Sequence, residues 1–148
     1  MTRAALLEFL RAHRFAVQAS AAPGGGAQAA VVGIAVSDDF EIVFDTLESS
    51  RKAHNLARDP RLAFVIGGLL DGEERTVQYE GVADRPGSGE LQAVQVLYFG
   101  TFPDGRERLT WPGLIHIRIK PQWLRYSDYR TEPPVILELT ATQLAELR

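Results

Sequence analysis

Two adjacent cations, Arg51 and Lys52, follow hydroxyl residues in a segment typical of a strand, a tight turn and a short helix. Both cations would fall in the first turn of that helix, where unpaired backbone amides already create a positive end. Basic side chains at this place are unfavourable by about 0.3–1 kcal/mol. With the hydroxyls of Thr46, Ser49 and Ser50 beside it, this concentration of positive charge is suited to bind an anion such as phosphate.

Local sequence alone leaves two interpretations of this segment open. Arg51 and Lys52 can be ordinary solvated residues of a surface helix, and the hydroxyls can serve only as helix caps. Capping is compatible with phosphate binding, because both roles use the same end of the helix. The sign of the charge favours the anion site.

Length and composition suit one compact domain. The chain has 148 residues, 45% of them hydrophobic, which is enough to bury a sizeable core. We therefore expect a single domain over residues 1–148. There is no cysteine, and His13, His54 and His116 lack the spacing of metal ligands. The sequence predicts neither a disulfide framework nor a structural zinc site.

Charge and hydropathy narrow the range of partners and compartments. The net charge is -3 and the pI is about 5.6, whereas nucleic-acid-binding surfaces normally carry a strong basic excess. No apolar run approaches the ~20 residues of a membrane span, and charge interrupts the opening residues too early for a secretory core. We expect a cytoplasmic protein that binds neither nucleic acid nor membrane.

The first part of the chain predicts a helix followed by a meander of strands. Apolar residues recur at helical spacing after Thr2, a suitable N-cap, and Pro23–Gly26 is the strongest turn signal. The strand after this turn has short, nearly all apolar side chains, so we expect it to be buried on both faces. The predicted elements are a helix over Arg3–His13 and strands over Phe15–Ser20, Ala27–Val36 and Glu41–Thr46.

The rest of the chain predicts further strands joined by short helices. Pro60 ends the helix that contains Arg51, since proline has no amide hydrogen and its ring blocks continuation. The predicted elements are helices over about Ser50–Arg58 and Ser88–Phe99, a loop at Pro103–Gly105, strands over Leu62–Ile66, Arg75–Ala83 and Leu114–Ser127, and a final helix capped by Thr140 and Gln143. The fold class is mainly β (α+β), a six-stranded antiparallel barrel with short flanking helices.

A wider set of residues resembles a known family. The pattern comprises Phe44, Thr46, Ser50-Arg51-Lys52-Ala53-His54 and Asp59-Pro60-Arg61, then Glu74-Arg75, Val77, Gly81 and Ala83, and finally Ile117-Arg118-Ile119-Lys120-Pro121. It closely resembles the pyridoxamine 5'-phosphate oxidase family of flavin mononucleotide (FMN) proteins. The resemblance covers about residues 14 to 128.

This resemblance implies a split barrel that forms a homodimer and holds two FMN molecules in clefts between the subunits. It implies that Arg51 and Lys52, next to Ser50, grip the FMN phosphate. It places the strand end at Asp45 and Thr46 along the flavin and ribityl chain. The flavin itself would transfer the hydride or electrons, so the resemblance implies no catalytic side chain from this sequence. A small-molecule substrate would occupy the open face of the flavin near the dimer cleft.

The departures from the family pattern concern the reaction. The family's founding enzymes carry an arginine and a lysine on the strand that here spans residues 30–35, and both are missing. The family's glutamine on a later strand is replaced by Thr76, which would still supply a polar cofactor contact. Nothing after Pro121 matches the segment that binds the phosphorylated pyridine. We therefore expect an unidentified small substrate and not pyridoxamine phosphate.

Two rival functions remain for the same fold. Relatives of this barrel bind the deazaflavin F420, whose phosphate would suit the same basic pocket. A flavin-binding module without turnover is the second alternative. Of the remaining candidates, Trp111 and Trp123 can line a cofactor pocket, although burial in a dimer interface fits large aromatic residues better. His54 is expected to be a surface or packing residue.

Overall fold

The computed structural model describes residues 1–148. Its strands form one eight-stranded antiparallel sheet in the order β2-β1-β5-β6-β7-β4-β3, with β8 paired to β7. The strands are β1 (Phe15–Ala21), β2 (Ala27–Gly33), β3 (Ala35–Val36), β4 (Ile42–Leu47), β5 (Arg61–Ile66), β6 (Arg75–Asp84), β7 (Leu114–Asp128) and β8 (Val135–Thr140). The helices are α1 (Arg3–Ala12), α2 (Arg51–Arg58), α3 (Leu91–Thr101) and α4 (Ala141–Glu146), with 3-10 segments η1 (Pro23–Gly25) and η2 (Pro103–Thr110).

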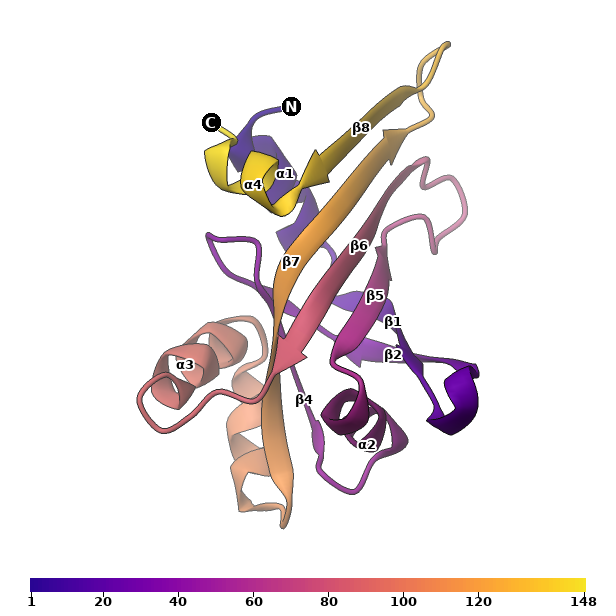
Figure 1. Ribbon diagram of the computed structural model, residues 1–148. Helices are drawn as coiled ribbons and strands as arrows, with labels where there is room; N and C mark the ends of the chain where they lie inside the picture. The colour runs from indigo at the N-terminus through magenta and orange to yellow at the C-terminus, as the bar shows by residue number, and fades with distance from the viewer.

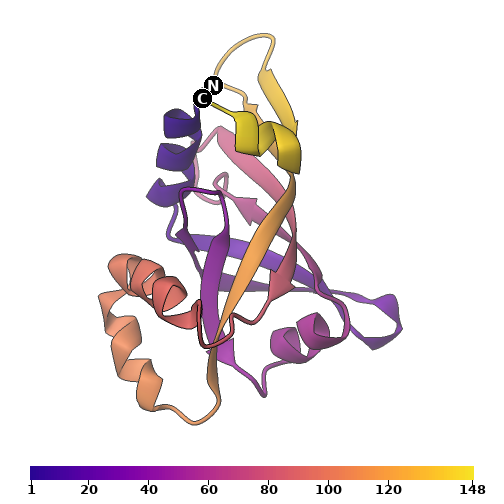
Figure 2. The same ribbon diagram turned by 60° about the vertical axis from the view of Figure 1, so that its left-hand side comes forward.

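Strand β7 joins the parts of the sheet, because it has 15 residues and pairs with three neighbours. Its first half pairs with β4 and its last six residues pair with β8, while β6 pairs along most of its other edge. The sheet coils into a half-barrel (Figure 1). Helix α2 closes one end of this barrel, and α1 and α4 lie together at the other end, near both termini (Figure 2).

The core lies between the inner faces of the strands. Its largest fully buried side chains include Tyr79, Phe40, Phe44 and Phe64, and burial of one such side chain contributes about 1.5–3 kcal/mol. The buried Tyr79 hydroxyl lies 3.1 Å from the Phe40 carbonyl oxygen and 3.2 Å from that of Ile119. These contacts tie β6 to β7 and to the turn between β3 and β4.

Most of the predicted elements are confirmed. The Thr2 hydroxyl accepts a hydrogen bond from the Ala5 amide at 3.2 Å and begins α1. The capping box of Thr140 and Gln143 begins α4. Helix α2 ends at Arg58, immediately before Asp59 and Pro60. None of the helices combines the length and the apolar character that crossing a lipid bilayer requires.

The prediction that Ala27–Val36 is one strand buried on both faces is wrong. The segment divides into β2 and β3, and Ala27, Ala29 and Val31 are exposed. Because β2 lies at the edge of the sheet and no other layer covers its outer face, short apolar side chains there do not imply burial. Composition alone could not separate a covered face from an uncovered one.

Three further predictions needed correction. The antiparallel split barrel is confirmed, but the count of six strands is wrong, since β3 is separate and β8 was not predicted. The expected loop at Pro103–Gly105 is instead the beginning of η2. Helix α3 begins at Leu91, three residues later than Ser88, and Glu90 at its N-cap makes no side-chain capping bond.

Candidate functional site

Helix α2 presents its N-terminus at one end of the barrel, directly after the end of β4. The Ser50 hydroxyl accepts a hydrogen bond from the Ala53 amide at 3.2 Å. The Thr46 hydroxyl donates to Ser50 Oγ at 2.9 Å, so the strand end and the helix start are linked by two side chains. No acidic residue occupies the first turn of α2. The end of the helix therefore keeps its positive electrostatic character.

Arg51 and Lys52 stand at this helix end without an acidic partner. Neither forms an ion pair with any carboxylate. The Arg51 guanidinium instead lies against the side-chain amide of Gln28 on β2, with its nitrogens 2.7, 2.8 and 3.0 Å from the amide oxygen in the favoured orientation. A neutral oxygen orients a guanidinium without neutralising it. Both positive charges remain available to an anion.

A small buried network supports Gln28 from the other side. Asn55, on the same face of α2 as Arg51, is 3% exposed, and its side-chain amide lies 3.1 Å from Ser20 Oγ on β1. The Gln28 amide also lies within hydrogen-bond distance of Asn55. Neither Gln28 nor Asn55 was predicted from the sequence to belong to the site. One signal was present, because Gln28 is the only polar residue in the otherwise apolar strand β2.

Asp45 is next to Thr46 in sequence, but its side chain lies on the opposite face of β4. The Asp45 carboxylate accepts hydrogen bonds from the Tyr98 hydroxyl at 2.9 Å and from Arg108 Nε at 2.7 Å. Burial, followed by the charge of Asp45, raises the pKa of Tyr98, so the phenol keeps its proton. Only the backbone of Asp45, and not its carboxylate, can face the same side as Thr46 and Ser50.

Thr76 lies far from α2 within one chain. It is the second residue of β6, whereas Ala83 and Asp84, at the other end of that strand, adjoin α2. Seven residues of strand correspond to about 20 Å. The structure thus brings together Thr46, Ser50, Arg51 and Lys52, and it separates them from Thr76 and from the Asp45 carboxylate.

The aromatic and histidine candidates also have defined places. Trp111 is 52% exposed in the segment before β7. This segment is fixed to the turn before α2, since the Glu48 amide donates to the Gly113 carbonyl at 2.7 Å. Trp123 lies half-buried on β7 opposite Glu80. His54 is exposed on α2, which agrees with its expected position at the surface.

The outer face of the sheet carries an apolar surface that no element of the chain covers. Val31, Val17 and Val65 are direct cross-strand neighbours on β2, β1 and β5. Val31 is 65% exposed and Val65 is 40% exposed. The next row of this apolar outer face consists of Ala29, Ala19 and Ala63.

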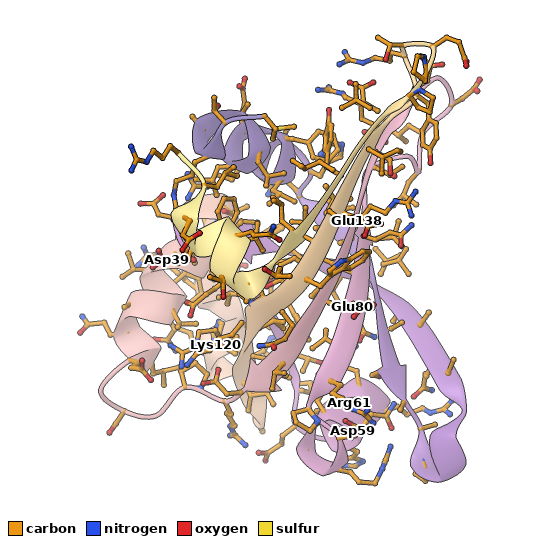
Figure 3. The ribbon with its side chains drawn as sticks, turned by 45° about the horizontal axis from the view of Figure 1, so that its top comes forward. Asp39, Asp59, Arg61, Glu80, Lys120 and Glu138 are labelled. Atoms are coloured by element: carbon orange, nitrogen blue, oxygen red, sulfur yellow. The ribbon has the colours of Figure 1, made fainter.

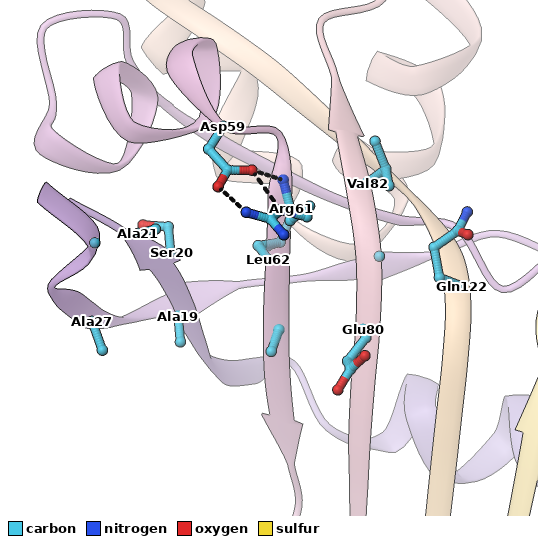
Figure 4. A pocket seen from close by; sticks show the side chains of 13 residues that line it. Ala19, Ser20, Ala21, Ala27, Asp59, Arg61, Leu62, Glu80, Val82 and Gln122 are labelled. Atoms are coloured by element: carbon cyan, nitrogen blue, oxygen red, sulfur yellow. Dashed lines mark hydrogen bonds and ion pairs between the residues drawn. The ribbon is translucent and has the colours of Figure 1, made fainter. Parts of the chain in front are cut away.

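A shallow hollow of about 560 Å³ lies on the same outer face (Figure 4). Small side chains, including Ala19 and Ala63, line its floor. At its edge Arg61 donates two hydrogen bonds to Asp59, at 2.9 and 2.7 Å. Figure 3 places this pair beside α2, with Glu80 farther along β6. A broad hollow of small residues offers little enclosure for a small ligand and is better suited to contact with a larger body.

The coiled antiparallel sheet, closed at one end by a helix with two unpaired cations, defines a protein of the split-barrel class. The chain belongs to the pyridoxamine 5'-phosphate oxidase family, whose sequence profile it matches over residues 2–128. No curated protein sequence matches the chain.

Solved structures support the same fold. A heme-binding protein from Mycobacterium smegmatis superimposes with a TM-score of 0.83 at 18% identity, covering 99% of this chain and 61% of that protein. A pyridoxamine 5'-phosphate oxidase-related, FMN-binding protein from Nostoc punctiforme gives 0.69 at 14% identity, covering 93% and 87%. The heme storage protein HutZ from Vibrio cholerae gives 0.69 at 14% identity, covering 80% and 89%. The chain thus spans less than two thirds of the M. smegmatis protein.

Proposed function

We propose that this protein is a homodimeric, FMN-binding oxidoreductase that acts on a small molecule other than pyridoxamine phosphate. Membership of the family supports the cofactor class. The N-terminus of α2 supports the position of the phosphate.

The two unpaired cations at the start of α2 are the observation that carries the proposal. In a chain with eleven ion pairs between arginine or lysine and a carboxylate, Arg51 and Lys52 lack a carboxylate partner although they lie where basic residues are unfavourable. A phosphate dianion would reverse that cost, because it would accept hydrogen bonds from both side chains and from the free amides of the helix. The residues present therefore fit the phosphate end of FMN.

The chain's own residues would bind and orient the cofactor. Arg51 and Lys52 would hold the phosphate, with Gln28 setting the direction of the Arg51 guanidinium. Thr46 and Ser50 would present their hydroxyl oxygens beside the strand end. Bound FMN supplies the hydride or electron transfer, and no side chain of this site is needed as a general acid or base.

Dimer formation would account for the two features that one chain leaves incomplete. Thr76 can join the same cofactor site as Arg51 only if it comes from the partner subunit, since about 20 Å separates the two ends of β6. The apolar outer face around Val31 and Val65 is uncovered in one chain. Its coverage by a second copy would remove exposed apolar surface from water.

Heme binding is the second candidate, because two proteins with this fold are named for it. Histidine is the common iron ligand among the residues this chain offers. His54 is the exposed histidine, whereas His13 bonds to the Phe9 carbonyl and Glu73 and His116 is 3% exposed. The deazaflavin F420 is the alternative that would use the same phosphate contacts as FMN.

A ligand titration combined with sedimentation tests these alternatives. We expect the purified protein to bind FMN with quenching of flavin fluorescence and to sediment as a dimer. The Val31→Lys variant, which places a charge in the apolar outer face, should sediment as a monomer and lose FMN affinity. Saturating binding of heme or F420 with no binding of FMN would overturn the cofactor assignment. A variant that stays dimeric would overturn the proposed interface.

A further inference from the structure

A second, smaller cavity of about 200 Å³ lies between α2, the end of β6 and the beginning of β7. At 3.6 residues per turn, its α2 residues Ala53 and Ala57 point away from Arg51, so this cavity is separate from the phosphate site. Its volume corresponds to several water molecules. The apolar side chains that line it are Ala53, Leu56, Ala57, Ala83, Ile115 and Ile117.

The charged residues Glu48, Asp84 and Arg85 also line this cavity. Arg85 has only a weak ion pair within the chain. Asp84 accepts two hydrogen bonds from Arg118, at 2.9 and 2.6 Å, and makes no ion pair with Arg85. Arg85 approaches Glu48 no closer than 3.5 Å, and both side chains are more than half exposed. A pair of this kind contributes little and is readily exchanged. The Arg85 guanidinium is therefore free to bind an anion at the opening.

An adjoining cavity of about 100 Å³ shares Arg85 and Ile115 with the first. It is also lined by His116, which is 3% exposed and whose Nε2 has no hydrogen-bond partner. A buried polar atom without a partner costs about 1–3 kcal/mol. Burial lowers the pKa of His116, with Asp45 opposing and Arg108 assisting that shift, so the imidazole is neutral. Arg85 thus stands between an apolar cavity and a second one that contains an unsatisfied polar group.

We propose that this pair of cavities binds a small apolar carboxylate, with the apolar body in the larger cavity and the carboxylate on Arg85. The site does not depend on the bound flavin. The carboxylate would replace Glu48 at the Arg85 guanidinium. The Glu48 side chain would then turn toward solvent. Neither the family pattern nor the residues of the phosphate site imply this second site.

The charged groups at the opening favour a ligand with a single negative charge. An arginine fork matches the two oxygens of a carboxylate. A phosphate dianion would be repelled more strongly by Glu48 and Asp84, and here a single guanidinium would face it. An ammonium group would meet Arg85 at the same opening. Burial of one ring or branched chain against the isoleucines and alanines supplies the favourable transfer from water.

Phenylacetate is a suitable probe, because its ring fits an apolar cavity of this size. In two-dimensional NMR of the full chain, we expect it to shift the amide signals of Ala53, Ala57, Ala83 and Arg85 with a dissociation constant on the order of 1 mM. Phenylacetamide, which lacks the charge, should bind at least about tenfold more weakly. Arg85→Gln should weaken phenylacetate binding by a similar factor.

Two further variants make the test selective. Ala57→Leu, a substitution that an exposed helix position tolerates, should block the cavity without removing Arg85. Arg106→Gln removes an exposed arginine that lines neither cavity and should bind phenylacetate as the unsubstituted protein does. Equal affinity for phenylacetamide, or shifts confined to the α2 N-terminus or the outer sheet face, would overturn the proposal. So would undiminished binding by Arg85→Gln or Ala57→Leu.

Discussion

The two faces of β4 differ in whether their charged groups are paired. On one face, Thr46 leads to Ser50, Arg51 and Lys52, where positive charge has no acidic partner. On the other face, the next side chain along the strand, Asp45, is held by two donors. Thr46 therefore belongs to an open site, whereas the adjacent Asp45 belongs to a closed network of hydrogen bonds.

The polar groups of the closed network find their partners within the chain. Arg108 bonds to Asp45 at 2.7 Å and to Asp104 at 3.2 Å, and the Tyr98 hydroxyl completes the group. A second closed group joins α3 to the sheet, where Arg118, only 8% exposed, bonds to Asp84 and Glu90. Charges that are paired in this way have no capacity left for a ligand. The comparison agrees with a phosphate site at the α2 end of β4 and with a structural role for the network around Asp45.

Removal of both unpaired cations should have the largest effect on binding. Arg51→Ala combined with Lys52→Ala should weaken FMN by about 100-fold or more, since two charge-assisted contacts of about 1.5–3 kcal/mol each would be lost. The free energy of unfolding should change little, because neither side chain has an ionic partner and both oppose the helix dipole. Fluorescence titration and urea denaturation measure the two quantities.

A matched control lies on the same helix. Arg58 is at the other end of α2 and donates to the Ala21 carbonyl, so Arg58→Ala removes a positive charge away from the site. Its FMN affinity should stay within about threefold of that of the unsubstituted protein, since a surface charge at this distance is largely screened. Equal losses in the two variants would show that general charge, and not the phosphate contact, controls affinity.

The open site at the start of α2 was easier to predict from the sequence than the closed network around Asp45. Arg51 and Lys52 could be found because their sign conflicts with their local position at a helix start. The network around Asp45 could not be found, since Tyr98 and Arg108 lie 53 and 63 residues away along the chain. The alternation of side chains along β4 already placed Asp45 opposite Thr46, but nothing local identified which face the site would use.

Prediction of the fold has the same limit, because local sequence does not show which strand lies at a sheet edge or which face another layer covers. The strands β5 and β6 and the N-caps of α1, α2 and α4 follow from local pattern and were predicted closely. The short apolar residues of β2 fit a strand buried on both faces equally well as a strand that leaves Val31 exposed. Strand β8 was missed because Glu132, Pro133 and Pro134 before it resemble a loop that continues. Long-range pairing with β7 decides its conformation.

Breaking the closed network should affect stability more than binding. Arg108→Met leaves the Asp45 carboxylate, which is 13% exposed, with one neutral donor. We expect a loss of about 2–3 kcal/mol in the free energy of unfolding, since an uncompensated carboxylate remains partly buried. FMN affinity should be nearly unchanged. Urea denaturation together with FMN titration separates the two effects.

A double-mutant cycle provides the control for this prediction. Asp45→Asn in the Arg108→Met background removes the stranded charge, so the double variant should be more stable than Arg108→Met alone. Strict additivity of the two single changes would contradict the pairing. A large loss of FMN affinity in either variant would contradict the assignment of this face to structure.

The smallest expected effect comes from the C-terminal end of α2, where an ion pair contrasts with the unpaired cations at its start. A side-chain hydrogen bond from Arg61, assisted by its backbone amide, lowers the pKa of Asp59 from 3.8 to about 2. Because the folded state holds the carboxylate ionised more strongly than the unfolded chain does, the pair contributes stability above about pH 4. This contribution disappears as the pH falls toward 2.

The Asp59→Asn variant isolates this contribution. Its urea midpoint should lie slightly below that of the unsubstituted protein at pH 6, and the two should converge between pH 4 and pH 2. Asp71→Asn, at an exposed position in the β5–β6 loop without an ion pair, should show no such convergence. A difference for Asp59→Asn that persisted unchanged at pH 2 would mean that Asp59 acts through its geometry at the helix end. The contrast between the paired and unpaired ends of α2 would then no longer rest on charge.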